Sequence, residues 1–398
     1  MKLLNVIPSV NPKSGGPIMG VNTIGSELTR LGHTQEIVCL DAPDETFVIN
    51  HQRKVYALGS SQNGYRYSPA LVPWLRTHAR NYDAVIVDGL WQHHSFGTWR
   101  ALAGSGIPYF VFTHGMLDPW FKRTYPLKHL KKWLYWPWAE YRVLRDATAV
   151  LFTCEEERLL ARESFWLYRC NEAVTAFGTS SPPIDASRLK ADFLSKHPQL
   201  EGKRLLLFLG RIHKKKGCDL LIEAFTQVAR KCPDLHLIIA GPDQTGWMAE
   251  LKQQASRHGI DDRITWPGML EGDEKWGAYY ASELFCLPSH QENFGIVVAE
   301  ALACGKPVMI SNKVNIWREI ESDHAGIVHD DTVEATTQAL QQWLDFMPET
   351  RLAMSQAARY CFDSRFRIDR VAESLVSIIQ NSVPPLSTPT HPAIDRGA

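Results

Sequence analysis

The stretch "SHQENFGIVVAEALACGKPV", residues 289–308, contains two glutamates in an otherwise apolar run. Glu292 lies in a loop-like segment. Glu300 lies among valine, alanine and leucine residues, where an unpartnered carboxylate is costly to bury. The preceding "LFCLPS" is typical of a buried strand, "HQENFG" of a turn, and "IVVAEALACG" of a helix that ends at Gly305. We therefore expect Glu292 just beyond a strand and Glu300 about two turns along the following helix.

The same alternation of strand and helix extends over the whole chain. Apolar segments typical of strands in the first half are "KLLNVIP", "TQEIVCLD", "DAVIVDG" and "PYFVFTHG", and those in the second half are "KRLLLFLGR", "LHLIIAG", "RITWPG", "LFCLPS" and "KPVMIS". Helical patterns such as "IMGVNTIGSELTRLGH" and "CDLLIEAFTQVAR" lie between them. Strands that alternate with helices predict parallel sheets, so the fold class is α/β with two Rossmann-like domains facing across a cleft.

The domain limits follow from composition, because 398 residues are too many for one typical core. We expect an N-terminal domain over 1–180 and a C-terminal domain over 181–362, linked near the Gly-, Ser- and Pro-rich "FGTSSPPID". An amphipathic helix is expected within 363–381. The segment 382–398 is predicted to be a disordered tail.

Charge and cysteines exclude several classes of protein. The 43 basic and 43 acidic residues balance, which gives no general reason to expect nucleic-acid binding. The eight cysteines are scattered without metal-ligand spacing, which argues against structural zinc and disulfides and fits a reducing cytosol. The sequence shows neither a secretory signal nor an apolar run long enough to span a membrane, so a cytoplasmic protein is expected.

Two motifs in the second half suit a phosphorylated ligand. The basic turn "GRIHKKKG", residues 210–217, lies between a strand and a helix, where Arg211 and Lys216 could reach a diphosphate. The alternative is a solvated basic loop. No P-loop sequence is present.

The second motif is the turn that carries the two glutamates. Backbone N–H groups of Asn293, Phe294 and Gly295 at the helix start could bind phosphate or sugar oxygens. A carboxylate accepts hydrogen bonds from vicinal hydroxyls, which suits a ribose. The alternative is that Glu292 caps the helix and Glu300 is a partnered core residue.

Two further turns in the first half are weaker candidates. In "SGGPIMG", Gly15 and Gly16 would allow the backbone to approach a phosphate or sugar closely, although this is not the Gly-x-Gly-x-x-Gly pattern of dinucleotide binders. In "FTHGMLDPW", His114 ends a buried strand. It could donate a hydrogen bond to a substrate, or it could cap neighbouring backbone.

Taken together, "LFLGRIHKKKGCDLLIEAF", "IIAGP" and "SHQENFGIVVAEALACGKPV" resemble the retaining glycosyltransferases of family 4, whose signature is a Glu-x7-Glu element before a Gly-x-Pro strand. "THGMLDPW" resembles members that assemble bacterial polysaccharides. The resemblance implies a two-domain GT-B fold, a nucleotide-sugar donor, no metal ion and no other cofactor. It also implies that the C-terminal helix, 363–381, returns to the N-terminal domain. From the negative charge that builds on the leaving phosphate, we expect front-face displacement, with that phosphate helping to deprotonate the acceptor.

The resemblance also assigns roles residue by residue. It implies that Glu300 binds the donor ribose, that Glu292 contacts the transferred sugar, and that Arg211 and Lys216 hold the diphosphate. His114 would lie near the transferred sugar and acceptor, and Gly16 beneath the diphosphate. The family often has Gly where this chain has Asn293. Asn tolerates positive φ better than most residues, so the turn is expected to survive, with a possible change in donor preference.

The segment "PWFKRTYPLKHLKKWLYWPW", residues 119–138, has five Lys or Arg, seven aromatic residues and no acidic residue. Its helical spacing puts lysines on one face and leucines on another. Basic and aromatic amphipathic helices lie in membrane interfaces. The residues expected to contact an anionic membrane are Lys128, Lys131, Lys132, Trp133 and Trp136. The alternative is a helix that packs Trp and Leu on the core with a wet basic face.

These features favour an enzyme at the inner face of the cell membrane that transfers a sugar to a lipid-linked or oligosaccharide acceptor for envelope or exopolysaccharide synthesis. Two other enzyme classes stay open, a sugar-nucleotide epimerase and a soluble sugar-phosphate synthase. A non-catalytic scaffold that binds nucleotide sugar or membrane is the alternative outside enzymes.

Overall fold

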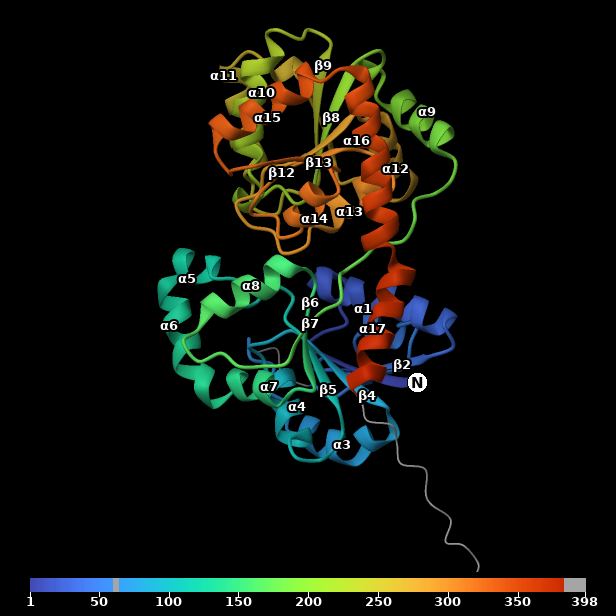
Figure 1. The fold of residues 1–398 in the computed structure, drawn as a ribbon, viewed down its shortest axis with the longest axis vertical. Coiled ribbons are helices and arrows are strands. Elements are labelled where there is room, and N and C mark those ends of the chain that lie inside the picture. The colour runs from blue at the N-terminus through green and yellow to red at the C-terminus, as the bar shows by residue number, and fades with distance from the viewer. Residues whose placement is uncertain (60–63, 383–398) are drawn as a thin grey trace, which may run out of the picture.

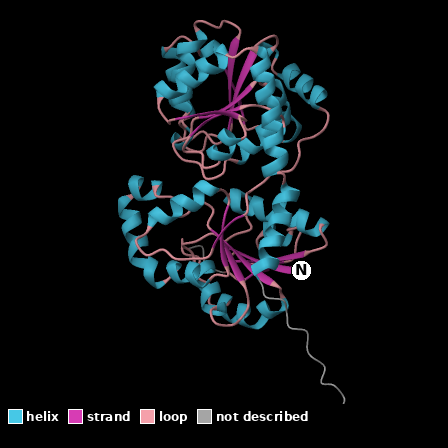
Figure 2. Ribbon diagram, viewed as in Figure 1, coloured by secondary structure: helices cyan, strands magenta, loops and turns pink. Residues whose placement is uncertain are grey.

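Two parallel β-sheets flanked by helices form the framework of the chain (Figures 1 and 2). The structure is a computed structural model, and it describes residues 1–59 and 64–382. The two sheets lie in separate lobes, one above the other in Figure 1, here called the N-lobe and the C-lobe. The predicted α/β fold class with two Rossmann-like domains is confirmed.

The N-lobe sheet has the strand order β3-β2-β1-β4-β5-β6-β7, with every pair parallel. Its strands are β1 (Lys2–Ile7), β2 (Thr34–Cys39), β3 (Val55–Ala57), β4 (Ala84–Asp88), β5 (Tyr109–Phe112), β6 (Ala149–Phe152) and β7 (Glu172–Val174). The four predicted strands are β1, β2, β4 and β5, and the unpredicted β6 is as long and as buried as β5. Two of the three unpredicted strands, β3 and β7, are three-residue edge strands without a buried run.

The C-lobe sheet has the order β10-β9-β8-β11-β12-β13, again parallel throughout. Its strands are β8 (Arg204–Leu209), β9 (Leu235–Ala240), β10 (Ile264–Gly268), β11 (Leu284–Leu287), β12 (Val308–Ser311) and β13 (Gly326–His329). Four strands from β8 to β12 are fully or almost fully buried runs, as expected for a sheet covered on both faces. Only β13 was not predicted.

Helices lie between successive strands in both lobes, and the last helices follow β13. Those of the first half are α1 (Gly16–Arg30), α2 (Thr46–Ile49), α3 (Leu71–His78), α4 (His93–Leu102), α5 (Trp120–Thr124), α6 (Pro126–Tyr135), α7 (Glu140–Asp146) and α8 (Glu155–Ser164). Those of the second half are α9 (Ala186–Lys196), α10 (Cys218–Ala229), α11 (Met248–Arg257), α12 (Gly272–Ala281), α13 (Ile296–Ala303), α14 (Trp317–Ser322), α15 (Val333–Asp345), α16 (Pro348–Cys361) and α17 (Ile368–Ser382).

The strand order reverses once in each sheet, and this positions the site. In the N-lobe, β1 is flanked by β2 and β4; in the C-lobe, β8 is flanked by β9 and β11. Connections from the two central strands leave toward opposite faces, so a crevice opens at their carboxyl ends, where ligands bind in such sheets. The turns after β1, β8 and β11 carry the glycine, basic and glutamate motifs, and the turn after β5 carries His114.

The last helix, α17, returns to the N-lobe and packs beside α1 (Figure 1). Its residues Val371, Leu375 and Ile379 are buried with Ile24 and Leu28 of α1. The helix begins at Ile368, after a π-helical turn at Phe362–Phe366. It includes Ser382, which was expected in the tail; 383–398 lie outside the described residues.

The chain therefore crosses between the lobes twice, and the two crossings are bonded to each other. Thr179 donates its N–H to the carbonyl of Phe366, and Ile368 donates to the carbonyl of Thr179, at 3.0 and 3.2 Å. Gly178 lies so close that a Cβ there would meet the Phe366 oxygen at 2.6 Å. This paired crossing lies at the predicted linker, residues 177–185.

Candidate active site

Two loops of the C-lobe, after β8 and after β11, are locked together. His290 donates its backbone N–H to the carbonyl of Lys215 at 2.8 Å. Gly217 has φ 66° and lies against Pro288, whose carbonyl oxygen a Cβ would meet at 2.1 Å. Only glycine combines this left-handed backbone with so close an approach. The spacing between the basic turn and the glutamate turn is therefore fixed.

Lys216 and Glu292 contact each other where these two loops meet. Burial and the positive charges of Arg211 and Lys215 lower the pKa of Lys216 to about 7. The carboxylate of Glu292 acts in the opposite direction, and an added diphosphate would do the same. Arg211 is exposed on this loop, and among the described residues it has no hydrogen-bond or ion-pair partner. The turn thus presents these three positive charges, of which Lys216 contacts the carboxylate of Glu292.

The start of α13 offers backbone donors to the same place. Among the hydrogen bonds of the described residues, none uses the backbone N–H groups of residues 293–297. Gly295 precedes the helix with φ 73° and is buried. Unpaired N–H groups at a helix start favour an anion. The expected helix-start amides are therefore available beside Lys216 and Glu292.

Glu300 lies on α13 and is 7% exposed. Its Oε1 lies 2.7 Å from Lys275 Nζ, and its Oε2 accepts from the Tyr279 hydroxyl at 3.1 Å, both on α12. The sequence did not reveal these partners, since neither residue belongs to the motif. A carboxylate has about four lone-pair positions and two are used here, so capacity for ribose hydroxyls is left.

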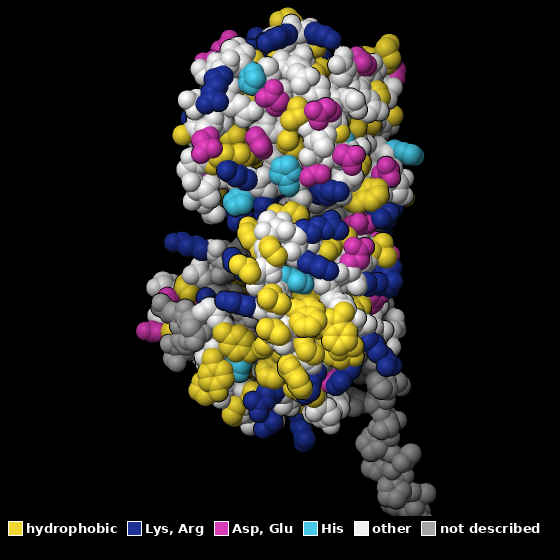
Figure 3. All heavy atoms as spheres, turned by 90° about the vertical axis from the view of Figure 1, so that its left-hand side faces the viewer, with side chains coloured by type: hydrophobic (Ala, Val, Ile, Leu, Met, Phe, Trp, Pro, Cys, Tyr) yellow, Lys and Arg dark blue, Asp and Glu magenta, His cyan; other side chains and the backbone are white. Residues whose placement is uncertain are grey.

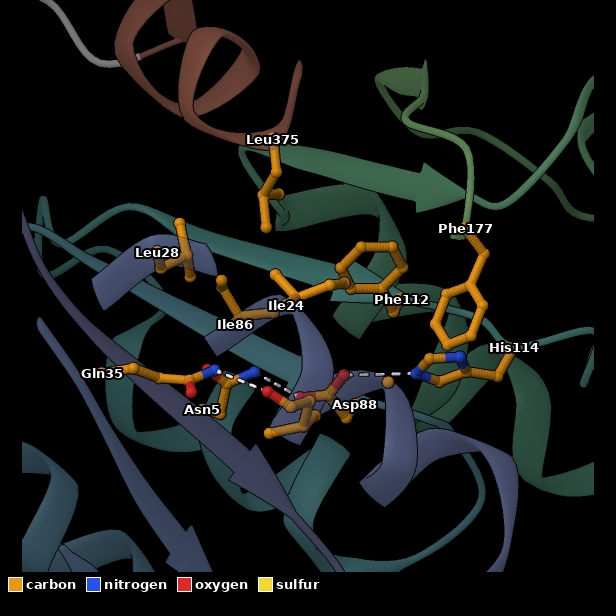
Figure 4. A pocket seen from close by; sticks show the side chains of 12 residues that line it. Asn5, Ile24, Leu28, Gln35, Ile86, Asp88, Phe112, His114, Phe177 and Leu375 are labelled. Atoms are coloured by element: carbon orange, nitrogen blue, oxygen red, sulfur yellow. Dashed lines mark hydrogen bonds and ion pairs between the residues drawn. The ribbon is translucent and has the colours of Figure 1, made fainter. Parts of the chain in front are cut away.

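His114 lies two residues beyond the end of β5 in the N-lobe, with its imidazole among buried side chains (Figure 4). Its Nε2 lies 3.2 Å from Asp88 Oδ1, and Asp88 Oδ2 accepts from Asn5 Nδ2 at 2.7 Å. Asn5 Oδ1 accepts in turn from Gln35. These hydrogen-bonded side chains border a cavity of about 10 Å³, which has room for about one water molecule. Asp88 ends β4, the strand next to β5, and was not predicted to have a role.

The glycine turn after β1 is open. Gly15 has φ 87°, and Gly16 is the first residue of α1. A Cβ on either glycine would meet nothing within 4 Å. The protein itself therefore demands glycine at position 15 through its backbone angle, and the expected close approach at Gly16 would have to come from a ligand.

Asn293 does not occupy the positive-φ turn considered for it, because it is absent from the residues with positive φ. Its side chain instead reaches the N-lobe. Nδ2 donates to Thr153 Oγ1 at 3.1 Å, and a Cβ on Gly115 would lie 2.6 Å from Asn293 Cγ. The turn after His114 and the turn after Glu292 therefore touch, which brings residues from both lobes into one site.

Three further contacts join the lobes around this point. Gln291 Nε2 donates to Asp118 at 2.9 Å, and Arg318 pairs with Glu156 at 2.6 Å. Lys215 Nζ lies 4.5 Å from the ring centre of Trp120. The lobes are in direct contact at the site, and Phe294 packs against Phe177 of the crossing segment.

The segment after His114 differs from the prediction for it. Trp136 is fully buried, stacked on Phe165 with ring centres 4.2 Å apart, so it cannot contact a membrane. Lys132 turns inward, with Nζ 4.3 Å above Trp91, and burial lowers its pKa to about 8. Lys128, Lys131 and Trp133 are exposed.

The leucines of α6 face outward instead of into the core. Leu127 is 78% exposed and Leu134 is 61% exposed. The alternative of leucines packed inward beneath a wet basic face is therefore wrong for this helix. His129 and Lys132 occupy its inner face, where His129 stacks on Phe165.

Neither a metal-ion site nor a membrane-spanning helix is found within the described residues. Within residues 1–59 and 64–382, no three His, Cys, Asp or Glu side chains are placed to hold one metal ion. In the same ranges no helix has the length and apolar character that crossing a bilayer requires.

Family models match both lobes. The model described as glycosyl transferases group 1 matches residues 190–360, and the model described as glycosyl transferase 4-like domain matches residues 15–171. Together they span the glycine turn, His114, the basic turn and both glutamates.

Two individual relatives are also named as sugar transferases, and each aligns with half of this chain or less. D-inositol 3-phosphate glycosyltransferase of Segniliparus rotundus is 29% identical over 44% of this chain and 39% of its own length. The lipopolysaccharide core biosynthesis mannosyltransferase LpsB of Rhizobium meliloti is 28% identical over 50% of this chain and 57% of its own length. The chain thus spans about two fifths to three fifths of these relatives.

Among solved structures, that of Anabaena Alr3699/HepE in complex with UDP-glucose aligns with a TM-score of 0.72 at 18% identity. The alignment covers 96% of this chain and 100% of that one. This likeness shows a shared two-lobed fold.

Proposed function

We propose, from the premise that this chain belongs to the family 4 glycosyltransferases of GT-B fold, that it transfers a hexosyl group from a nucleotide-diphosphate sugar to an acceptor. The observation that carries the proposal is the junction of Lys216, Glu292 and the unpaired N–H groups of residues 293–297. This junction offers positive charge and amide donors for a diphosphate, beside carboxylates that suit sugar hydroxyls.

The chemistry follows from where charge develops. When the sugar leaves, positive charge grows on its ring and negative charge grows on the diphosphate. Lys216 and the helix-start amides are held in place before the reaction, so they would stabilise the leaving group without reorganising, and the exposed Arg211 would add its charge on binding. This arrangement would replace a metal ion in that role. Glu292 would contact the transferred sugar, and Glu300 the ribose.

We further propose that the sugar is transferred with retention, by attack of the acceptor from the face that the diphosphate leaves. The cations and amides would surround a diphosphate bound beside Lys216, and that diphosphate would then take the acceptor's proton. We assign no covalent nucleophile. His114, held by Asp88, would donate to the transferred sugar or acceptor.

The N-lobe carries an exposed apolar surface, here called the α6 surface (Figure 3). It consists of Tyr125, Leu127, Leu130, Trp133, Leu134, Trp138 and Trp166. Exposed Lys122, Arg123, Lys128 and Lys131 accompany it. Outward leucines and tryptophans flanked by lysines suit the interface of an anionic membrane. We therefore propose a lipid-linked saccharide acceptor and peripheral membrane binding at the cytoplasmic leaflet, in envelope or exopolysaccharide synthesis.

A soluble phosphorylated acceptor is the alternative, and the D-inositol 3-phosphate glycosyltransferase among the relatives supports it. The two differ in one observable. Transfer to a soluble sugar phosphate would not need the α6 surface. Transfer to a lipid-linked acceptor would be accelerated when that acceptor is supplied in vesicles.

The experiment that tests donor binding is thermal unfolding with UDP, GDP or ADP, each with and without Mg²⁺. A ligand at about 100 times its Kd adds about 2.7 kcal/mol to stability, a clear shift in Tm. We expect one nucleotide to raise Tm equally with and without Mg²⁺, and Glu300→Ala to abolish the shift. Release of the matching nucleotide from its sugar conjugates then identifies the donor. No shift with any nucleotide would contradict the donor site and favour a scaffold that binds a membrane.

A further inference from the structure

Glu157, near the start of α8, is a buried carboxylate with no role in the reaction proposed above. It is 3% exposed and accepts four hydrogen bonds. Oε1 accepts from the Thr113 hydroxyl at 2.6 Å and from the Gly115 N–H at 2.5 Å. Oε2 accepts from the N–H and the hydroxyl of Thr153 at 2.7 and 2.6 Å. Four donors fill the accepting capacity of a carboxylate.

The two residues bonded to Oε1 stand on either side of His114. His114 has φ 48° and Gly115 has φ 72°, so two successive residues are left-handed. A side chain with a Cβ is disfavoured there and persists when its surroundings hold it. Because both neighbours of His114 are tied to one oxygen, Glu157 fixes the backbone turn that aims the imidazole. Asp88 fixes the ring itself.

The same carboxylate is linked to the C-lobe through one hydroxyl. Thr153 Oγ1 donates to Glu157 and accepts from Asn293 Nδ2 at 3.1 Å. Asn293 directly follows Glu292 and lies against Gly115. A single line of hydrogen bonds therefore runs from the His114 turn, through Glu157 and Thr153, to the Glu292 loop of the other lobe.

We propose that Glu157 is a positioning residue for glycosyl transfer: it holds His114 in its left-handed turn and, through Thr153 and Asn293, sets that turn against the Glu292 loop when the lobes are closed. The proposal rests on the proposed function, since the task of His114 comes from there. Glu157 itself touches neither donor nor acceptor and exchanges no proton with them.

The direct test is Glu157→Gln, which keeps the shape but turns an N–H₂ group toward the donors of Thr113 or Thr153. We expect the rate of nucleotide release from the sugar nucleotide to fall at least about tenfold, with nucleotide Kd unchanged within about twofold, because the nucleotide site lies in the C-lobe. The matched control is Glu140→Gln. Glu140 is also buried in the N-lobe and accepts from Trp91 and Ser95, and it accepts no hydrogen bond from Thr113 or Gly115. Its rate should stay within about twofold.

A double-mutant cycle separates positioning from general support of the lobe. If Glu157 acts through His114, then Glu157→Gln in a His114→Ala background should slow the reaction less than about twofold further. Losses that multiply in full would overturn the proposal. If Glu157→Gln does not fold, Thr153→Val removes only the linking hydroxyl, and the same cycle is run with it, with the same two outcomes.

A second readout does not depend on turnover. Hydrogen exchange should rise at the bonded amides of Gly115 and Met116, and also at those of Glu292 and Asn315, when Glu157 is replaced by Gln, and at neither pair for Glu140→Gln. A rise confined to the N-lobe would overturn the coupling between lobes. If the unmodified protein releases nucleotide from no sugar nucleotide, the proposed function fails, while the exchange data still decide whether Glu157 couples the two loops.

Discussion

The basic turn of the C-lobe and helix α6 of the N-lobe both carry clustered lysines, and they use them in opposite ways. In the turn, Lys216 contacts a carboxylate beside unpaired amides, and an anionic ligand would supply the acceptors that these amides lack. In α6, Lys132 is packed on Trp91 while Leu127 and Leu134 face solvent. A lysine-rich segment therefore does not by itself identify an anion site. Its neighbours decide whether the charge or the apolar surface meets the ligand.

The largest expected effect is a loss of stability, and it tests whether Trp136 faces the core while Trp138 faces solvent. Trp136→Ala should lower the free energy of unfolding by about 3–5 kcal/mol, because a fully buried, stacked ring leaves a cavity. Trp138→Ala, two residues along and 69% exposed, should change it by less than about 0.5 kcal/mol. Urea unfolding measures both. Equal losses would contradict the orientation.

The second largest expected effect is the loss of turnover when the lysine of the basic turn is replaced. Lys216→Ala should reduce kcat for nucleotide-sugar turnover by roughly 10²–10³, as expected when a preorganised partner of the leaving group is removed. Lys214→Ala, an exposed lysine in the same turn, is the control and should lose less than about threefold. Turnover by Lys216→Ala at the level of the unmodified protein would exclude this lysine from leaving-group stabilisation.

A smaller effect is expected on membrane binding when one leucine of the α6 surface is replaced. Leu134→Ser should weaken binding to vesicles containing anionic lipid by about 1–2 kcal/mol, a partial share of the free energy of burying a leucine. Leu352→Ser on α16 is an exposure-matched control, since both leucines are 61% exposed. Co-sedimentation measures the difference. Equal binding by both variants, or binding without any dependence on anionic lipid, would remove the membrane assignment.

The smallest effect is a pH dependence of donor binding. The pKa of Lys216 is lowered to about 7 in the free site, and a bound diphosphate raises it. Below that pKa the lysine is charged before and after binding, so affinity is flat. Above it, binding must take up a proton, so affinity for the nucleotide sugar should fall about fivefold from pH 7 to pH 8. Calorimetry measures this, and Lys216→Met should bind more weakly and without this slope.

The C-lobe site could largely be predicted because its chemistry is local. A buried strand, a turn with Gly217 or Gly295, and a helix follow one another in the chain, so the turn residues necessarily lie at a carboxyl edge. That β8 and β11 are neighbours then brings Lys216 to Glu292.

Three consecutive glutamates show why the rest could not be predicted. Glu155 pairs with Arg158 on its own helix, Glu156 pairs with Arg318 of the other lobe, and Glu157 is buried beneath His114. Identical neighbours in sequence give no signal for three different partners. The partners of Glu300 on α12 were equally hidden, because they come from a helix outside the motif.

By itself, the sequence determined the alternation of strands and helices, the two lobes, and the turns that carry Gly15, His114, the basic residues and Glu292, because each depends on residues close together in the chain. Only the tertiary structure decided which face of α6 is buried, what neutralises Glu300, and that Asn293 reaches across to Thr153. Periodicity defines two faces of a helix but does not say which one has a neighbour to pack against. The neighbour comes from a distant part of the chain, and only the folded arrangement supplies it.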